Sequence, residues 1–175
     1  MKINESNMHF LQDYVMLTVH RSQINEAKYN PRIINDQNYK DLKKSLKKIK
    51  LREPLIWNKT SGNLIGGHQR LKILDEEWQK KYKNLDYDLI VAAVELDYKQ
   101  EIELNIALNN PRLMGDYSIE KMNKILSNEE FPDIDFEIAG IKDEDLQIFG
   151  IEADLKNLDI AEIEETIQNF EQIKA

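Results

Sequence analysis

Two adjacent glycines, Gly66-Gly67, stand between an apolar run and an amphipathic pattern. The run Asn63-Leu-Ile-Gly66 has the composition of a short strand, and residues 68 to about 83 place apolar side chains at helical spacing. A strand that leads directly into a helix is typical of mixed α/β domains. The sequence therefore predicts an α/β (α+β) fold in which the glycine pair lies at a strand-to-helix junction.

The remaining elements are expected from the same patterns. Gly62, at the end of the turn Lys59-Thr-Ser-Gly62, supplies positive φ for a hairpin between residues 54–58 and 63–66. Asp36 is the expected N-cap of a lysine-rich amphipathic helix that runs to about Ile49. We further expect a strand at 15–20, a central strand at 88–97 covered on both faces, and helices at 99–108 and from a Ser118 cap to about 126.

Charge is segregated along the 175 residues. Residues 129–175 carry a net charge of −12, which leaves +4 on the preceding part of a chain whose total is −8. We expect an N-terminal extension at 1–14, one main domain at 15–127 and an acidic C-terminal extension at 128–175 with helical patterns at 142–149 and 160–173. An acidic tail of this kind is compatible with partner binding, self-association or simple solvation.

Composition excludes several kinds of site. The chain contains no cysteine, so disulfides, thiolate metal sites and cysteine nucleophiles are absent. Its three histidines, His9, His20 and His68, do not have metal-ligand spacing, and no metal site or serine-histidine-acid triad is expected. No apolar run approaches the roughly 20 residues of a membrane helix, so we expect a cytoplasmic protein with no membrane partner.

The glycine turn has the chemistry of a phosphate site. Gly66 and Gly67 lack a Cβ, so backbone N–H groups at the start of the next helix are approachable. Arg70 can donate bidentate hydrogen bonds to phosphate oxygens, while His68 and Gln69 add polar contacts or orient a base or water. The alternative is that the same pattern arises for purely structural reasons.

Other polar groups allow two interpretations each. Asn30 and Arg32 could reach the same ligand, or form an ordinary surface turn around Pro31. The lysines of the helix after Asp36 could contact DNA phosphates, or only solvate the helix. Asn109, Asn110 and Arg112 at a helix end suggest capping by themselves. The candidate DNA-binding residues are Lys40, Lys43, Lys44, Lys47 and Lys48.

The order of elements, with Leu64-Ile-Gly-Gly-His-Gln-Arg-Leu71 between strand and helix, resembles the ParB N-terminal domain family of the ParB/sulfiredoxin superfamily. More narrowly it resembles the small ParB-like nuclease-domain proteins of phages and mobile elements. The resemblance covers residues 15–127 and includes Asn30-Pro-Arg32 and Glu103-Leu-Asn-Ile-Ala-Leu-Asn-Asn110. It implies a site for the phosphates of a nucleoside triphosphate, CTP or ATP, formed by Gly66, Gly67, His68, Gln69 and Arg70, with Asn30, Arg32, Asn109, Asn110 and Arg112 as neighbours.

Two departures limit what the resemblance implies. Sulfiredoxin chemistry needs a cysteine in the glycine turn, so that reductase activity is excluded. ParB CTPases carry a Glu-Asn-x-x-Arg box that helps hold magnesium, and Asn109-Asn-Pro-Arg112 lacks its acid and one residue of its spacing. Nucleotide binding is therefore a firmer expectation than magnesium-assisted hydrolysis.

Three functions remain open from the sequence. The leading hypothesis is a ParB-like nucleotide-binding and DNA-associated protein of phage or mobile-element DNA metabolism. The enzymatic alternative is a nuclease or weak NTPase, with His68 as general acid or base and Arg70 stabilising charge on the phosphorus oxygens. The third is a non-catalytic adaptor whose acidic tail binds a protein partner such as a DNA methyltransferase.

Overall fold

The computed structural model describes residues 9–126, 135–142 and 145. The chain divides into two compact units, Met1–Met114 and Gly115–Ala175. The helical patterns expected at 142–149 and 160–173 lie almost entirely outside the described residues, and the expected boundaries near 14 and 127 stay predictions.

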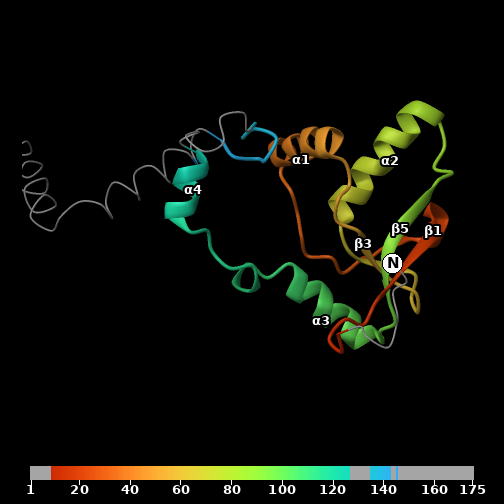
Figure 1. Ribbon diagram of the computed structural model, residues 1–175. Coiled ribbons are helices and arrows are strands. Elements are labelled where there is room, and N and C mark those ends of the chain that lie inside the picture. Colours follow the sequence, from red (N-terminus) through yellow and green to blue (C-terminus); the bar gives the residue numbers. More distant parts are fainter. Residues whose placement is uncertain (1–8, 127–134, 143–144, 146–175) are drawn as a thin grey trace, which may run out of the picture. The chain divides into compact units, whose positions relative to one another are not determined.

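A five-stranded mixed sheet forms the first unit (Figure 1). Its strands are β1 (Val15–His20), β2 (Asn25–Glu26), β3 (Leu55–Asn58), β4 (Asn63–Gly66) and β5 (Asp88–Val94), in the spatial order β1-β5-β3-β4-β2. The β1–β5 and β3–β4 pairs are antiparallel, whereas β5–β3 and β4–β2 are parallel. This arrangement confirms the predicted α/β class.

Three α-helices belong to the same unit: α1 (Asp36–Ile49), α2 (His68–Tyr82) and α3 (Tyr98–Leu108). Two short 3-10 helices, η2 (Arg21–Gln23) and η3 (Pro111–Leu113), join its elements. Asp97 caps α3 by accepting a hydrogen bond from the Gln100 amide at 2.9 Å, which ends β5 before the expected residue 97. In the second unit, α4 (Ile119–Leu126) follows the predicted cap Ser118, whose Oγ accepts from the Lys121 amide at 3.4 Å.

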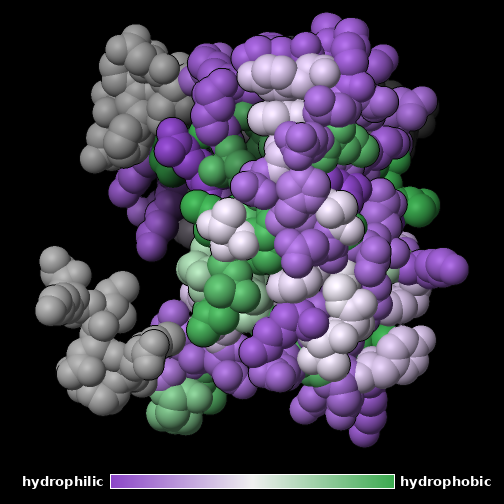
Figure 2. Space-filling view, turned by 90° about the vertical axis from the view of Figure 1, so that its right-hand side faces the viewer, coloured by the Kyte–Doolittle hydropathy of each residue, from purple (hydrophilic) through white to green (hydrophobic). Residues whose placement is uncertain are grey.

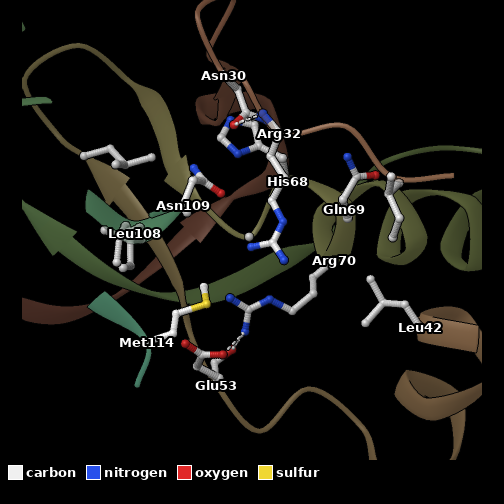
Figure 3. A pocket seen from close by; sticks show the side chains of 15 residues that line it. Asn30, Arg32, Leu42, Glu53, His68, Gln69, Arg70, Leu108, Asn109 and Met114 are labelled. Atoms are coloured by element: carbon white, nitrogen blue, oxygen red, sulfur yellow. Dashed lines mark hydrogen bonds and ion pairs between the residues drawn. The ribbon is translucent and has the colours of Figure 1, made fainter. Parts of the chain in front are cut away.

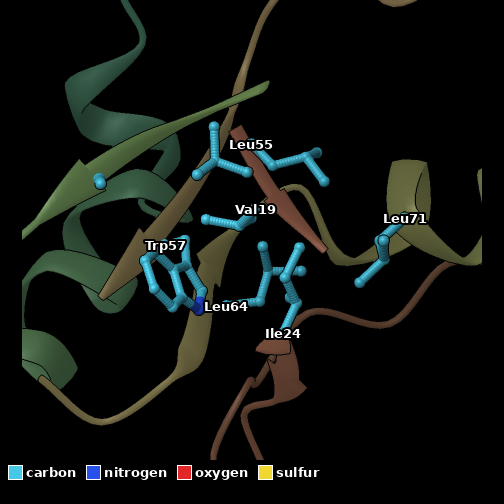
Figure 4. Close-up of a cluster of buried hydrophobic side chains, with 8 residues drawn as sticks. Val19, Ile24, Leu55, Trp57, Leu64 and Leu71 are labelled. Atoms are coloured by element: carbon cyan, nitrogen blue, oxygen red, sulfur yellow. The ribbon is translucent and has the colours of Figure 1, made fainter. Parts of the chain in front are cut away.

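One face of the sheet carries the main hydrophobic core (Figure 4). Because side chains alternate along a strand, Leu55 and Trp57 of β3 point to the same side. Leu71 of α2 packs against this side and is fully buried. The other members of the cluster are Val19, Ile24, Leu64, Val91 and Ala93.

On the opposite face, α3 packs against β4. Asn105 donates to the Ile65 carbonyl at 2.8 Å, and a Cβ placed on Gly66 would lie 3.2 Å from Leu108 Cδ1. Glu101, also on α3 and fully buried, accepts hydrogen bonds from the side chains of Tyr29, Asn58, Ser61 and Asn63. These contacts fix α3 to the β3–β4 hairpin.

The structure differs from the expected elements in three places. Asn35 rather than Asp36 is the N-cap of α1, since Asn35 Oδ1 accepts from the Asn38 amide at 2.7 Å. Strand β2 was not predicted, because two residues show no periodicity. Strand β5 is internal, but Ile90 is 60% exposed and therefore not covered on both faces as expected.

Hydrophilic side chains dominate the face of the molecule drawn in Figure 2, with apolar side chains gathered in a smaller area. The exposed large apolar residues of β1 and β5 are Val15, Met16, Leu17 and Ile90. Within the described ranges, no helix has the length and apolar character needed to cross a membrane.

Candidate functional site

The glycine turn lies at the strand-to-helix junction that the sequence predicts. Gly67 has a φ of +97° and is the N-cap of α2, with no side chain capping the helix. A Cβ at this position would lie 2.4 Å from Leu55 Cδ2, a contact that real Cβ atoms do not make. Both the left-handed backbone and the close approach of the core require glycine here.

Backbone donors face the turn at the start of α2. The first hydrogen bond of the helix is made by the Leu71 amide to the Gly67 carbonyl, at 2.9 Å. The amides of His68, Gln69 and Arg70 therefore have no acceptor within the helix. Together with the positive end of the helix dipole, these N–H groups favour a bound anion.

The turn opens into a cavity of about 380 Å³ (Figure 3). Apart from Glu53, the polar groups of its lining come from the predicted residues, and apolar side chains of α1, α3 and the sheet also line it. The polar lining residues are Asn30, Arg32, Glu53, His68, Gln69, Arg70 and Asn109; the others are Ile34, Leu42, Ile56, Ile65, Gly66, Gly67, Leu108 and Met114.

Two guanidinium groups converge on this cavity. Figure 3 shows the side chains of Arg32 and Arg70 pointing into the same space from different parts of the chain. Arg32 follows a turn in which its amide donates to Asn30 Oδ1 at 3.4 Å. Arg70 lies over the glycine turn, with Nη2 3.4 Å from the position that a Gly67 Cβ would take. Two arginines beside free helix amides form a strongly anion-attracting site.

Glu53 is a lining residue that the sequence did not indicate. Its Oε2 lies 2.7 Å from Arg70 Nη1, and the same nitrogen donates to the Glu53 carbonyl at 3.2 Å. The two residues are 17 positions apart on different elements, so no local spacing marks the pair. Among the residues that line the cavity, Glu53 is the single carboxylate.

His68 has one ring nitrogen without a partner. Its Nε2 is buried and makes no hydrogen bond among the described residues. Burial lowers the pKa of His68, although the charge of Glu26 and a hydrogen bond with the Leu64 backbone oppose the effect. The imidazole is consequently held in its neutral form near pH 7.

The residues at the end of α3 are only partly brought into the site. Asn109 lines the cavity and donates to the Asn105 carbonyl at 2.8 Å. Asn110 instead caps η3 by accepting from the Arg112 amide at 3.1 Å, and neither Asn110 nor Arg112 lines the cavity. With Glu53 paired to Arg70, the lining does not present a set of carboxylates that would fit magnesium.

The lysines of α1 lie away from the cavity lining. Lys43 is bound to Glu76 and Glu77 of α2 at 2.7 and 3.1 Å, and Lys47 is bound to Glu77 at 2.9 Å. Lys43 and Lys47 therefore link α1 to α2, although the sequence placed them on the outer face of the helix. Lys40, Lys44 and Lys48 are exposed, and a DNA-binding role for the five lysines stays a prediction.

A serine, a histidine and an aspartate do meet on the surface near η2. His20 Nδ1 lies 2.7 Å from Ser22 Oγ, and His20 Nε2 lies 3.0 Å from Asp86 Oδ1. The Asp86 side chain is 82% exposed, and none of the three residues lines the cavity. His20 is the N-cap of η2, so this group caps a helix end.

A mixed sheet flanked by helices, with an arginine-rich cavity at a glycine strand-to-helix turn, defines a small α/β domain with an anion-attracting site. No protein-family model matches the chain, and no curated protein matches it. Among solved structures it is similar to C-terminally truncated ParB, a chromosome-partitioning protein of Caulobacter crescentus, complexed with CTP-gamma-S. The TM-score is 0.50 at 17% identity, over 71% of this chain and 69% of that one.

A Pnob8-like ParB-N domain is similar with a TM-score of 0.43 at 18% identity, over 66% of this chain and 48% of that chain. The Caulobacter structure shows that this chain has a ParB-like fold, which confirms the fold expected from the resemblance in sequence.

Proposed function

We propose that this protein is a ParB-like nucleotide-binding protein whose cavity holds the phosphates of a nucleoside triphosphate. The observation that carries the proposal is the convergence of Arg32, Arg70 and the uncapped amides of α2 on one cavity. A triphosphate carries several negative charges, so it can engage both guanidinium groups and the amides at once.

The apolar part of the lining favours a nucleotide over inorganic phosphate. Ile34, Leu42 and Met114 offer an apolar surface against which a base or sugar can pack. A cavity of about 380 Å³ falls within the usual range for small-molecule sites. CTP is the first candidate, because the Caulobacter ParB structure is complexed with CTP-gamma-S.

The test is calorimetric titration of the full chain with CTP, ATP and GTP, with and without magnesium. Arg70→Ala should weaken binding by about 10- to 100-fold, because a hydrogen bond to a charged group contributes about 1.5–3 kcal/mol. Arg52→Ala is the matched control, since Arg52 is exposed, donates to the Ile49 carbonyl and does not line the cavity. Equal affinity in Arg70→Ala and Arg52→Ala would contradict the proposal.

Hydrolysis is the second candidate function, and the observation that favours it is the unpartnered His68 Nε2 in a cavity-lining residue. A neutral imidazole can accept a proton from water, and because Nε2 is buried here this role requires the ring to turn toward the bound phosphate. If this chemistry occurs, phosphate release from the bound nucleotide should disappear in His68→Ala while nucleotide binding persists. The nuclease and adaptor roles stay predictions from the sequence.

A further inference from the structure

Arg70 is already bound to an anionic side chain in this structure. Glu53 lies directly before Pro54 and β3, and its Oε2 is 2.7 Å from Arg70 Nη1. A residue that precedes proline is restricted to extended backbone, which limits the directions its side chain can take. Arg70 and this carboxylate meet within the lining of the cavity (Figure 3).

The two partners differ in how strongly they are held. The Glu53 side chain is 77% exposed, whereas that of Arg70 is 20% exposed. The Glu53 carboxylate can therefore leave for solvent, where water replaces its hydrogen bond, without unpacking its surroundings. Arg70 keeps a second acceptor in the Glu53 carbonyl, at 3.2 Å, so it remains beside the glycine turn when the carboxylate leaves.

Arg32 provides the contrast. It lines the same cavity, and its guanidinium has no carboxylate partner within the part of the chain that the structure describes. An incoming anion can thus bind Arg32 directly, whereas on Arg70 it must compete with Glu53 for Nη1 and for the charge of the guanidinium.

We propose that Glu53 is an intramolecular competitor that holds Arg70 until the phosphates of a ligand displace it, and so determines which anions the site accepts. The inference rests on the proposed nucleotide site. A small monovalent anion gains little by exchanging places with a carboxylate, because one negative charge replaces another. A triphosphate replaces the carboxylate and at the same time binds Arg32 and the amides of α2, so it displaces Glu53 readily.

If Glu53 instead positioned Arg70 for phosphate, removing it would change the affinity in the opposite direction. If Glu53 held Arg70 in the orientation that binds phosphate, its removal would leave Arg70 mobile and weaken binding. The sign of the change in affinity therefore separates a competitor from a positioning residue.

The experiment is calorimetric titration of the full chain, as wild type, Glu53→Gln and Glu26→Gln, with CTP and with inorganic tripolyphosphate. Glu26 is the matched control, because its charge acts on His68 but it neither lines the cavity nor binds Arg70. Glu53→Gln should bind both probes about two- to fivefold more tightly at low salt, and the gain should shrink as salt is raised. Glu26→Gln should gain less than Glu53→Gln.

Three results would overturn the inference. Unchanged or weaker binding in Glu53→Gln would show that Glu53 does not compete, and an equal gain in Glu26→Gln would show only general charge repulsion. Both results leave the nucleotide site intact, provided that the wild type binds CTP. If neither probe binds any of the three proteins, the proposed function fails and the role of Glu53 fails with it.

Discussion

The two ends of strand β4 differ in how completely their polar groups are paired. At the Asn63 end, the buried carboxylate of Glu101 accepts hydrogen bonds from four side chains. At the Gly66 end, α2 begins without a capping side chain and His68 Nε2 has no partner among the described residues. We call the first the closed end and the second the open end.

The closed end therefore stabilises the fold, whereas the open end is available to bind a ligand. A buried carboxylate is tolerated when its lone pairs are all used, so the closed end fixes α3 to the hairpin and has no capacity left for a ligand. The open end keeps backbone donors that have no acceptor within the helix and from which a ligand anion can accept. A four-residue strand thus joins a structural polar cluster to a candidate binding site.

The largest effect is expected from removing the closed end's acceptor. Glu101→Ala leaves the four donors around it without their partner, and we expect a loss of about 3 kcal/mol or more in the free energy of unfolding. Urea denaturation measures this loss. Glu103→Ala, on the same helix with a side chain 61% exposed, should cost less than about 0.5 kcal/mol. Similar losses in the two variants would show that the hydrogen bonds to Glu101 do not stabilise the fold.

Glycine substitutions at the two ends should give a smaller and unequal effect. Gly67→Ala places a methyl group 2.4 Å from the buried Leu55 and forces alanine into a φ of +97°. We expect a cost of about 2–3 kcal/mol.

Gly62→Ala is the control at the closed end, with a φ of +76° and a nearest neighbour, Asn25 Nδ2, on a side chain that can move. Its cost should be about 1 kcal/mol, since the strained backbone is then the main penalty. Thermal unfolding of the two variants measures this difference. Equal unfolding midpoints for Gly67→Ala and Gly62→Ala would contradict the close packing of Gly67 against Leu55.

Acidification should lower the free energy of unfolding through protonation of Glu101, by a smaller amount than the substitutions above. Burial raises the pKa of Glu101, but the hydrogen bonds from Ser61, Tyr29, Asn63 and Asn58 outweigh it and lower the pKa below 4.5. A carboxylate whose pKa is lower in the folded state stabilises the fold above its unfolded value of about 4.5, and this stability is lost as pH falls through the folded pKa.

Urea denaturation across this acidic range should therefore show a shallower pH dependence for Glu101→Gln than for the wild type. An unchanged pH dependence would mean that Glu101 does not titrate differently in the folded and unfolded states.

Local patterns were enough to predict most of the fold. Apolar alternation predicted β1, and short apolar runs joined by a turn predicted β3 and β4. Helical spacing predicted α1 and α2, α3 lies where a helix was expected at 99–108, and Gly62 has the expected positive φ. The two-residue strand β2 has no such pattern, and the exposed half of β5 depends on how far α3 extends over the sheet.

Local patterns indicated only the consecutive part of the site, whereas Asn30, Arg32 and Asn109 were expected beside it from the family resemblance. The run from Gly66 to Arg70 is marked by its position between strand and helix, and the structure brings Asn30, Arg32 and Asn109 to the same cavity. Glu53 and Glu101 were missed, because their partners lie 17 and 38 to 72 positions away and no spacing rule connects them. DNA contact, catalysis and partner binding stay predictions.

The most direct test of the open end is a titration of the ¹⁵N-labelled protein with CTP, followed by the backbone amide resonances in NMR spectra. We expect saturable shifts at the amides of Gly67, His68 and Gln69, with little change at Ser61, Gly62 and Asn63. Absence of shifts at Gly67–Gln69, or equal shifts at both ends of β4, would contradict the claim that the open end binds nucleotide phosphates.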